Sequence, residues 1–161
     1  MTNVVYNHFK HVLGTQSVNL GAAGGGGAGT LPVALVTTNT TADTEADVAT
    51  VSAFSTLDEY DGANYPSPRA DLENPSYDKD AANNRSELTA DPTEFLSLGP
   101  GTRQCQGAVV IYQVGASPND ANDIPAFWVD EGGFPFDGTG ADVTVNWDTE
   151  GALQVGGAGN P

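Results

Sequence analysis

Glycine and proline interrupt this sequence so often that most of it cannot form long helices. The chain has 161 residues, of which 20 are glycine and 10 are proline. Both residues disfavour a helix interior and are common in turns. Short apolar runs stand between these interruptions. The pattern therefore predicts a chain that folds with many turns and has a single convincing helix, at its N-terminus.

Residues 1–13 are predicted to form that helix. Asn3 can cap its start and Gly14 can end it. Apolar residues recur at the spacing of one helix face, at Val5, Phe9, Val12 and Leu13. Residues 21–29 contain only glycine and alanine, so they are predicted to form a flexible connector.

Residues 30–161 are predicted to form a β body. Leu31 to Thr37 is a valine-rich apolar run that suits a buried first strand. A polar loop is expected over 38–47, and helical turns are expected around Val51 and Phe54. Further strands are predicted over 70–74, 76–79, 85–89, 93–98, 106–114, 125–129, 143–148 and 152–155, with a turn at Asn83 and Asn84.

The fold prediction follows from these elements. We expect residues 1–161 to form a single domain that is mainly β, with one N-terminal α-helix and long loops. A small antiparallel β-sandwich and a partly closed barrel both fit, and the C-terminal half is predicted to be a β meander.

The charge of the chain excludes several partners. Five Lys and Arg residues stand against 21 Asp and Glu residues, which gives a formal net charge of −16. Such a chain is repelled by nucleic acid and by anionic membranes. No apolar run reaches the length of a membrane span, and residues 1–20 lack a secretory signal pattern. We expect neither nucleic acid nor membrane as a partner.

The sequence contains no convincing cofactor or metal motif. The glycine run fits a dinucleotide fingerprint only literally, since it precedes a strand instead of opening a helix. Cys105 is the only cysteine, so it cannot form an internal disulfide, and it is predicted to be semi-buried at a strand edge. His8 and His11 could face one metal, but no third ligand is identifiable. We expect no cofactor.

Acidic loops leave one alternative open. Asp78, Asp80 and Asn83 resemble the start of a calcium loop, but the later ligand positions do not fit. An irregular calcium site among Asp120, Asn122 and Asp123 remains a possible alternative. No set of residues with catalytic spacing is recognisable, so no enzymatic activity is expected.

Aromatic residues in one loop suggest either core packing or a contact surface. Phe134 and Phe136 lie in a loop broken by glycine and proline. Core packing is favoured for these rings, and contact with a partner is the alternative. Trp128 and Trp147 fall inside predicted strands and are expected in the core.

Three segments in order resemble small virion structural proteins of tailed bacteriophages. They are Val-Val-Tyr-Asn-His-Phe-Lys near the start, Leu-Pro-Val-Ala-Leu-Val-Thr from residue 31, and Gly-Ala-Val-Val-Ile-Tyr from residue 107. Further agreement lies in residues 57–65, 98–102 and 143–153. The glycine run departs from the pattern, because relatives tend to have a polar turn there.

The resemblance implies a function. Proteins of this kind are similar in size to head decoration, or cement, proteins, which bind the outside of a shell of major capsid protein and often form trimers. A tail or fibre component is the alternative, and a calcium-dependent carbohydrate-binding module or small hydrolase is a further one. The location implied is the outer surface of the head, after synthesis in the host cytoplasm. The predicted contact residues with the capsid or with other subunits are Tyr6, Phe9, Lys10, Phe134 and Phe136.

Overall fold

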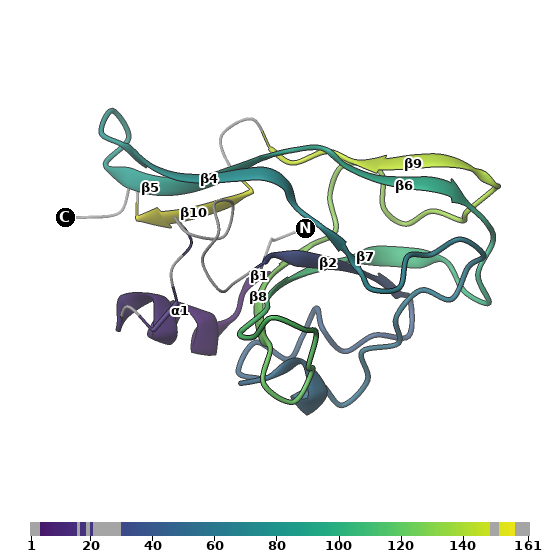
Figure 1. Ribbon diagram of the computed structural model, residues 1–161, viewed down its shortest axis with the longest axis horizontal. Coiled ribbons are helices and arrows are strands. Elements are labelled where there is room, and N and C mark those ends of the chain that lie inside the picture. The colour runs from purple at the N-terminus through teal and green to yellow at the C-terminus, as the bar shows by residue number, and fades with distance from the viewer. Residues whose placement is uncertain (1–3, 16, 19, 21–29, 149–151, 157–161) are drawn as a thin grey trace.

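The computed structural model describes residues 4–15, 17, 18, 20, 30–148 and 152–156. These residues form a two-layer β-sandwich with one α-helix, and the described strands do not close into a barrel (Figure 1). The elements in chain order are β1 (Val4–Val5), α1 (Asn7–Gly14), β2 (Pro32–Thr37), the short 3₁₀ helix η2 (Val51–Ala53), β3 (Ala70–Asp71), β4 (Glu73–Asp80), β5 (Arg85–Asp91), β6 (Thr93–Leu98), β7 (Cys105–Tyr112), β8 (Ile124–Val129), β9 (Ala141–Val145) and β10 (Leu153–Gly156).

The first layer is a five-stranded antiparallel sheet in the order β1-β8-β7-β2-β3. All six residues of β2 are buried, as are nearly all residues of β7. The two strands are therefore covered on both faces, which explains why β2 is a continuous apolar run without alternation. Gly107 on β7 is required by this packing, because a Cβ there would lie 2.5 Å from the ring of Trp128.

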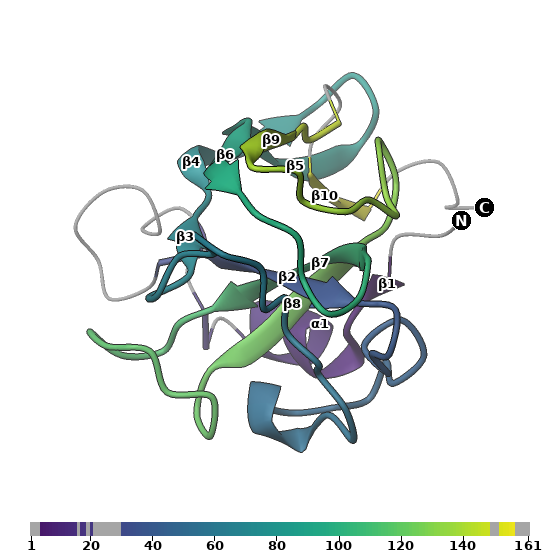
Figure 2. The same ribbon diagram turned by 90° about the vertical axis from the view of Figure 1, so that its right-hand side faces the viewer.

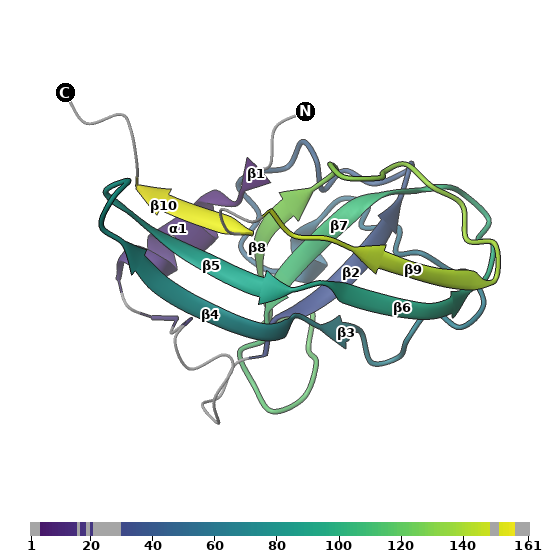
Figure 3. The ribbon, with the colours of Figure 1, turned by 90° about the horizontal axis from the view of Figure 1, so that it is seen from above.

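The second layer consists of the three-stranded sheet β10-β5-β4 and the two-stranded sheet β6-β9. β5 runs directly into β6, with only Pro92 between them (Figure 3). Proline has no N–H to donate to a ladder, so the strand changes partners at that residue. Along β6, Thr93, Phe95 and Leu98 are buried against the first layer.

The helix covers the opposite face of the five-stranded sheet, together with the loops that surround η2 (Figure 2). Tyr6 and Phe9 are both 0% exposed. The Tyr6 ring contacts Phe54 edge to face at 5.5 Å, and its hydroxyl donates to the Ala42 carbonyl at 2.8 Å. Full burial of such side chains contributes about 1.5–3 kcal/mol each.

The helix begins later than the sequence pattern predicts. Val4 and Val5 pair with Trp128 and Phe127 as an edge strand, so α1 starts only at Asn7. The hydrogen bonds offered by β8 outweigh local helix periodicity for these two valines. The predicted cap Asn3 and the predicted connector at 21–29 lie outside the described residues. The helix ends at Gly14, one residue beyond the predicted range, and Thr15 takes the C-cap position.

Most strands lie where they were predicted, but their connectivity differs. β6 matches the predicted range, and the predicted turn at Asn83 and Asn84 joins β4 to β5. The predicted meander is wrong, because β9 pairs with β6 and β7 pairs with β2 and β8. Side-chain alternation fixes which face is buried but does not select the partner strand.

The two tryptophans and the single cysteine are all buried. Trp128 and Trp147 are core residues as predicted, at 1% and 9% exposure, although Trp147 lies just beyond β9. Its indole N–H donates to the Thr93 hydroxyl at 3.2 Å. The prediction for Cys105 is wrong, since it is fully buried where β7 begins between β2 and the backbone of Phe136. No described helix has the length and apolar character to cross a membrane.

Candidate functional site

The predicted contact residues fall into two groups in the structure. Tyr6 and Phe9 are fully enclosed by their own chain. Their assignment as contact residues is therefore corrected: they hold the helix on the sheet and present no surface. Lys10 is exposed on α1, where its ammonium donates to the Asn7 side chain at 3.3 Å. Its contact with a partner remains a prediction.

The loop with Phe134 and Phe136 packs on the core, and part of it remains exposed to solvent. Phe136 exchanges two backbone hydrogen bonds with Cys105, at 2.8 and 3.0 Å. The two rings lie 5.4 Å apart, and Phe136 also packs at 6.3 Å from Tyr60. Both phenylalanines are half-buried. Their rings thus pack on the core, which was the favoured prediction. Because part of each side chain stays exposed, a contact with a partner remains a prediction.

Two acids of the candidate calcium loops, Asp123 and Asp80, accept backbone N–H groups. Asp123 is 1% exposed, and its carboxylate accepts N–H groups from Val114 and Asn119 at 3.0 and 2.7 Å. Asp80 accepts N–H groups of Ala82 and Asn83 and caps the β4–β5 turn. Within the described part of the chain, no three His, Cys, Asp or Glu side chains gather as metal ligands.

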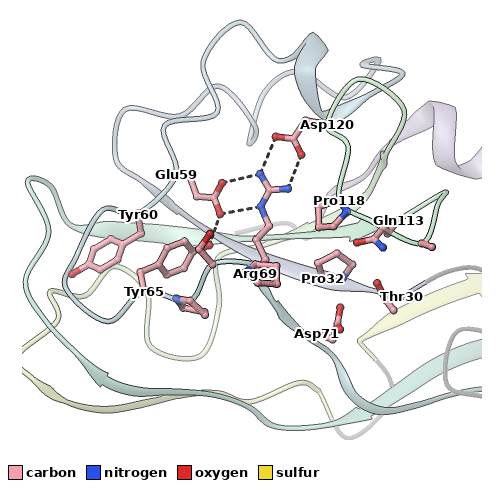
Figure 4. Close-up of a pocket in the computed structure, with 14 residues that line it drawn as sticks. Thr30, Pro32, Glu59, Tyr60, Tyr65, Arg69, Asp71, Gln113, Pro118 and Asp120 are labelled. Carbon is pink, nitrogen blue, oxygen red and sulfur yellow. Dashed lines mark hydrogen bonds and ion pairs between the residues drawn. The ribbon is translucent and has the colours of Figure 1, made fainter.

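A cleft that the sequence did not indicate lies at one end of the five-stranded sheet (Figure 4). Its volume is about 1050 Å³, and it is open to solvent. The lining includes Thr30, Pro32, Glu59, Tyr65, Arg69 and Asp120. Ligand pockets commonly have volumes of about 300–1,000 Å³. The cleft is therefore the candidate site.

Arg69 is the centre of this cleft. Its guanidinium donates two hydrogen bonds to Glu59, at 2.9 and 2.7 Å, and two to Asp120, at 2.7 and 3.1 Å. The Arg69 side chain is 13% exposed. Two-pronged contacts of this kind fix the plane of the guanidinium. Arg69 thus joins the 59–69 segment to the 116–123 loop.

Tyr65 extends this network to the sheet. Its hydroxyl donates to Glu59 Oε1 at 2.6 Å and accepts the Leu35 N–H of β2 at 3.1 Å. Burial raises the pKa of Tyr65 well above its usual value, with the Glu59 charge adding to the effect. The tyrosine therefore stays protonated and donates to the Glu59 side chain that also contacts Arg69.

The neighbouring Tyr60 joins three loops through one hydroxyl. Tyr60 is 2% exposed. Its O–H donates to the Gly99 carbonyl and accepts the N–H groups of Gly101 and Gly138, each at 2.9 Å. The ring also packs at 6.2 Å from Tyr65. This wall of the cleft is thus built on a buried and fully bonded hydroxyl.

The electrostatics of the cleft favour a positively charged ligand. Glu59, Asp71 and Asp120 are its carboxylates, and Arg69 is the one base in its lining. Burial alone would lower the pKa of Arg69, but hydrogen bonds and charges of Glu59 and Asp120 outweigh this and raise it. Burial also raises the pKa of the Asp71 carboxyl, against a hydrogen bond from Thr30. Three carboxylates against one guanidinium leave a negative cleft.

The thiol and the imidazoles of the described residues lie apart from the carboxylates of the cleft. Burial raises the pKa of Cys105 to about 12, so this thiol is neutral at pH 7 and is no nucleophile. Both histidines belong to α1, whereas the cleft lies among β2, β3 and the loops at 59–69 and 113–120. Comparisons with protein families, with curated proteins and with solved structures found no match to this chain.

The hydrogen-bonded carboxylates of the loops predict a loss of stability in acid. Hydrogen bonds from Thr102 lower the pKa of Asp61, the Asn83 side chain lowers that of Asp80, and Ser55 lowers that of Glu45. A carboxyl group whose pKa is lower in the folded protein stabilises the folded state at pH values above its unfolded pKa of about 4. This stabilisation is lost as the pH falls through the pKa of the folded state. Asp71 acts in the opposite direction.

We therefore expect the urea midpoint to be lower at pH 3 than at pH 5. The variant Asp61→Asn should lose less between these two pH values than the wild type, because it lacks one of the three groups. Glu94→Gln, at an exposed position of β6, is the matched control and should lose as much as the wild type. A wild-type midpoint that rises from pH 5 to pH 3 would contradict the expectation.

Proposed function

We propose that this chain is a virion structural protein of a tailed bacteriophage, a decoration protein that binds the outside of the major capsid shell and stabilises it. The resemblance of its segments to that class suggests the role. The observation that carries the proposal is the one-sided charge of a rigid β body. The chain has a net charge of −16, and Arg69, Arg85 and Arg103 are all paired with its own acids.

This charge distribution favours an exterior position. A protein whose arginines are already neutralised has little to offer the phosphates of packaged DNA, and its acids are repelled by them. On the outer face of a shell the same acids are solvated and screened beyond about 8 Å at physiological salt. We further propose a homo-oligomer on the shell, with a trimer favoured.

The test is binding to undecorated shells of the cognate major capsid protein. We expect saturable binding of many copies per shell, resolved by cryo-electron microscopy on the outer surface. Binding should raise the temperature at which the shell disrupts. A few copies at the tail would instead support a tail or fibre component. Absence from the virion would overturn both and favour the carbohydrate-binding or hydrolase alternatives.

The phenylalanine loop gives a sharper version of the test. Phe134→Ala should weaken shell binding about tenfold or more, because interface aromatics carry a large share of binding energy. Leu96→Ala is the matched control, since Leu96 is 62% exposed on β6 of the second layer and is not among the predicted contacts. Both variants are first compared with the wild type by thermal unfolding. Unchanged affinity of a folded Phe134→Ala variant would exclude this loop from the contact.

A further inference from the structure

The cleft around Arg69 has a floor made by three adjacent strands. Pro32 on β2 pairs with Asp71 on β3. On the other side, the N–H of Gln113, just beyond β7, donates to the Thr30 carbonyl at 3.0 Å. Asp71 thus stands opposite Pro32, and Gln113 stands opposite Thr30, at the same end of the sheet. All four residues line the cleft (Figure 4).

The walls of the cleft combine rigid apolar groups with carboxylates. Pro66 and Pro68 come from the 59–69 segment and Pro118 from the loop at 113–120, and they line the cleft together with Tyr65. Prolines expose apolar rings whose backbone is already restricted, so contact with them costs little ordering entropy. Such walls suit the methylene stem of a long side chain or an extended peptide.

Asp71 is the carboxylate that lacks a cationic partner. It is exposed at the mouth of the cleft and forms no ion pair with another described residue. Glu59 and Asp120 are engaged by Arg69, yet their side chains remain 27% and 44% exposed. Carboxylate oxygens accept more than one hydrogen bond. Acceptors for an incoming N–H donor therefore remain on both sides of Arg69.

The charge of this chain makes a different protein a better source of a cation than another copy, which could offer only the exposed Lys10 and Lys79. The chain has five basic residues among 161, and its three arginines are each held in an ion pair. A second copy would also bring its own large negative charge to a negative cleft. Charge complementarity thus favours a partner segment that carries free lysine or arginine.

We propose that the cleft binds a lysine or arginine side chain on an extended segment of the capsid subunit, with Asp71 as its carboxylate partner and the proline walls around its stem. The inference rests on the proposed function for the identity of the partner. The preference of the cleft for a cation does not depend on that identity.

The first experiment tests the cleft alone, with N-acetyl-arginine-N-methylamide as the probe. We expect amide signals of Thr30, Asp71 and Gln113 to shift saturably in a titration followed by nuclear magnetic resonance. The citrulline analogue, which has the same shape without the charge, should bind about three- to fivefold more weakly. Asp71→Asn should weaken arginine binding by a similar factor. Glu73→Gln, an exposed carboxylate on β4, is the matched control and should leave it unchanged.

Two results would overturn the inference. One is equal binding of the arginine and citrulline probes. The other is a set of shifts spread over the acidic surface and unaffected by Asp71→Asn. The second experiment measures binding to shells for Asp71→Asn and Glu73→Gln. If the wild type binds shells and a folded Asp71→Asn variant binds equally well, the cleft proposal fails while the decoration role stands. If the wild type binds no shell but the arginine probe still occupies the cleft, the decoration role fails alone.

Discussion

Replacing Tyr60 by phenylalanine is expected to lower the free energy of unfolding by about 2–4 kcal/mol. The change removes one oxygen from a site that is 2% exposed. It leaves the Gly101 and Gly138 N–H groups and the Gly99 carbonyl without their partner. Each buried polar group left without a partner costs about 1–3 kcal/mol, and local relaxation recovers part of the sum.

Urea unfolding measures this effect directly. The midpoint should fall while the slope stays unchanged, which separates a loss of stability from a change in the unfolded state. Tyr77→Phe is the matched control, because Tyr77 is half-buried on β4 and its hydroxyl has no hydrogen bond to another described residue. We expect that control to differ from the wild type by less than about 0.5 kcal/mol. Equal midpoints for Tyr60→Phe and Tyr77→Phe would show that the hydroxyl does not hold the three loops.

The second large effect is expected at Arg69. The variant Arg69→Met should cost about 2 kcal/mol, because it removes the counter-charge from between Glu59 and Asp120 and leaves two carboxylates facing one another. Partial exposure of both acids keeps the cost below that of a fully buried pair. Arg69→Lys should recover only part of the loss, since an ammonium cannot form two two-pronged contacts.

The matched control is Arg103→Met. The Arg103 side chain is 49% exposed and makes one contact with Asp58 at 3.1 Å, so its loss should cost less than about 0.5 kcal/mol. Thermal and urea unfolding compare the three variants, and amide exchange of residues 113–120 reports whether that loop has been released. Equal stability of Arg69→Met and the wild type, with unchanged exchange, would mean that Arg69 does not join the two segments.

The parts of the fold that could be predicted from sequence are those that local patterns determine. The apolar run at Leu31 to Thr37 is long enough to be read as a strand covered on both faces, and β2 occupies it. The predicted strand at 93–98 has the same limits as β6. β1 was missed because Val5 has helical spacing with Phe9, and only pairing with Trp128 and Phe127 makes Val4 and Val5 a strand.

The candidate site could not be predicted in the same way. Arg69 lies 10 residues from Glu59 and 51 residues from Asp120 in sequence, so no spacing motif marks the three as a unit. The sequence did contain one indication, which is the small number of basic residues. The chain has five basic and 21 acidic residues. Arg69, which follows two prolines and precedes an acid-rich segment, therefore has many carboxylates with which to form an ion pair.

The change of partner at Pro92 has a mechanical consequence. β4, β5 and β10 form one panel of the second layer, β6 and β9 form another, and a single strand passes between them through a residue that donates no hydrogen bond (Figure 3). The two panels therefore meet at a crease, while the five-stranded layer beneath them is continuous. A force that bends the sandwich would deform it at this crease, and the hydrogen bonds between strands within each panel would remain.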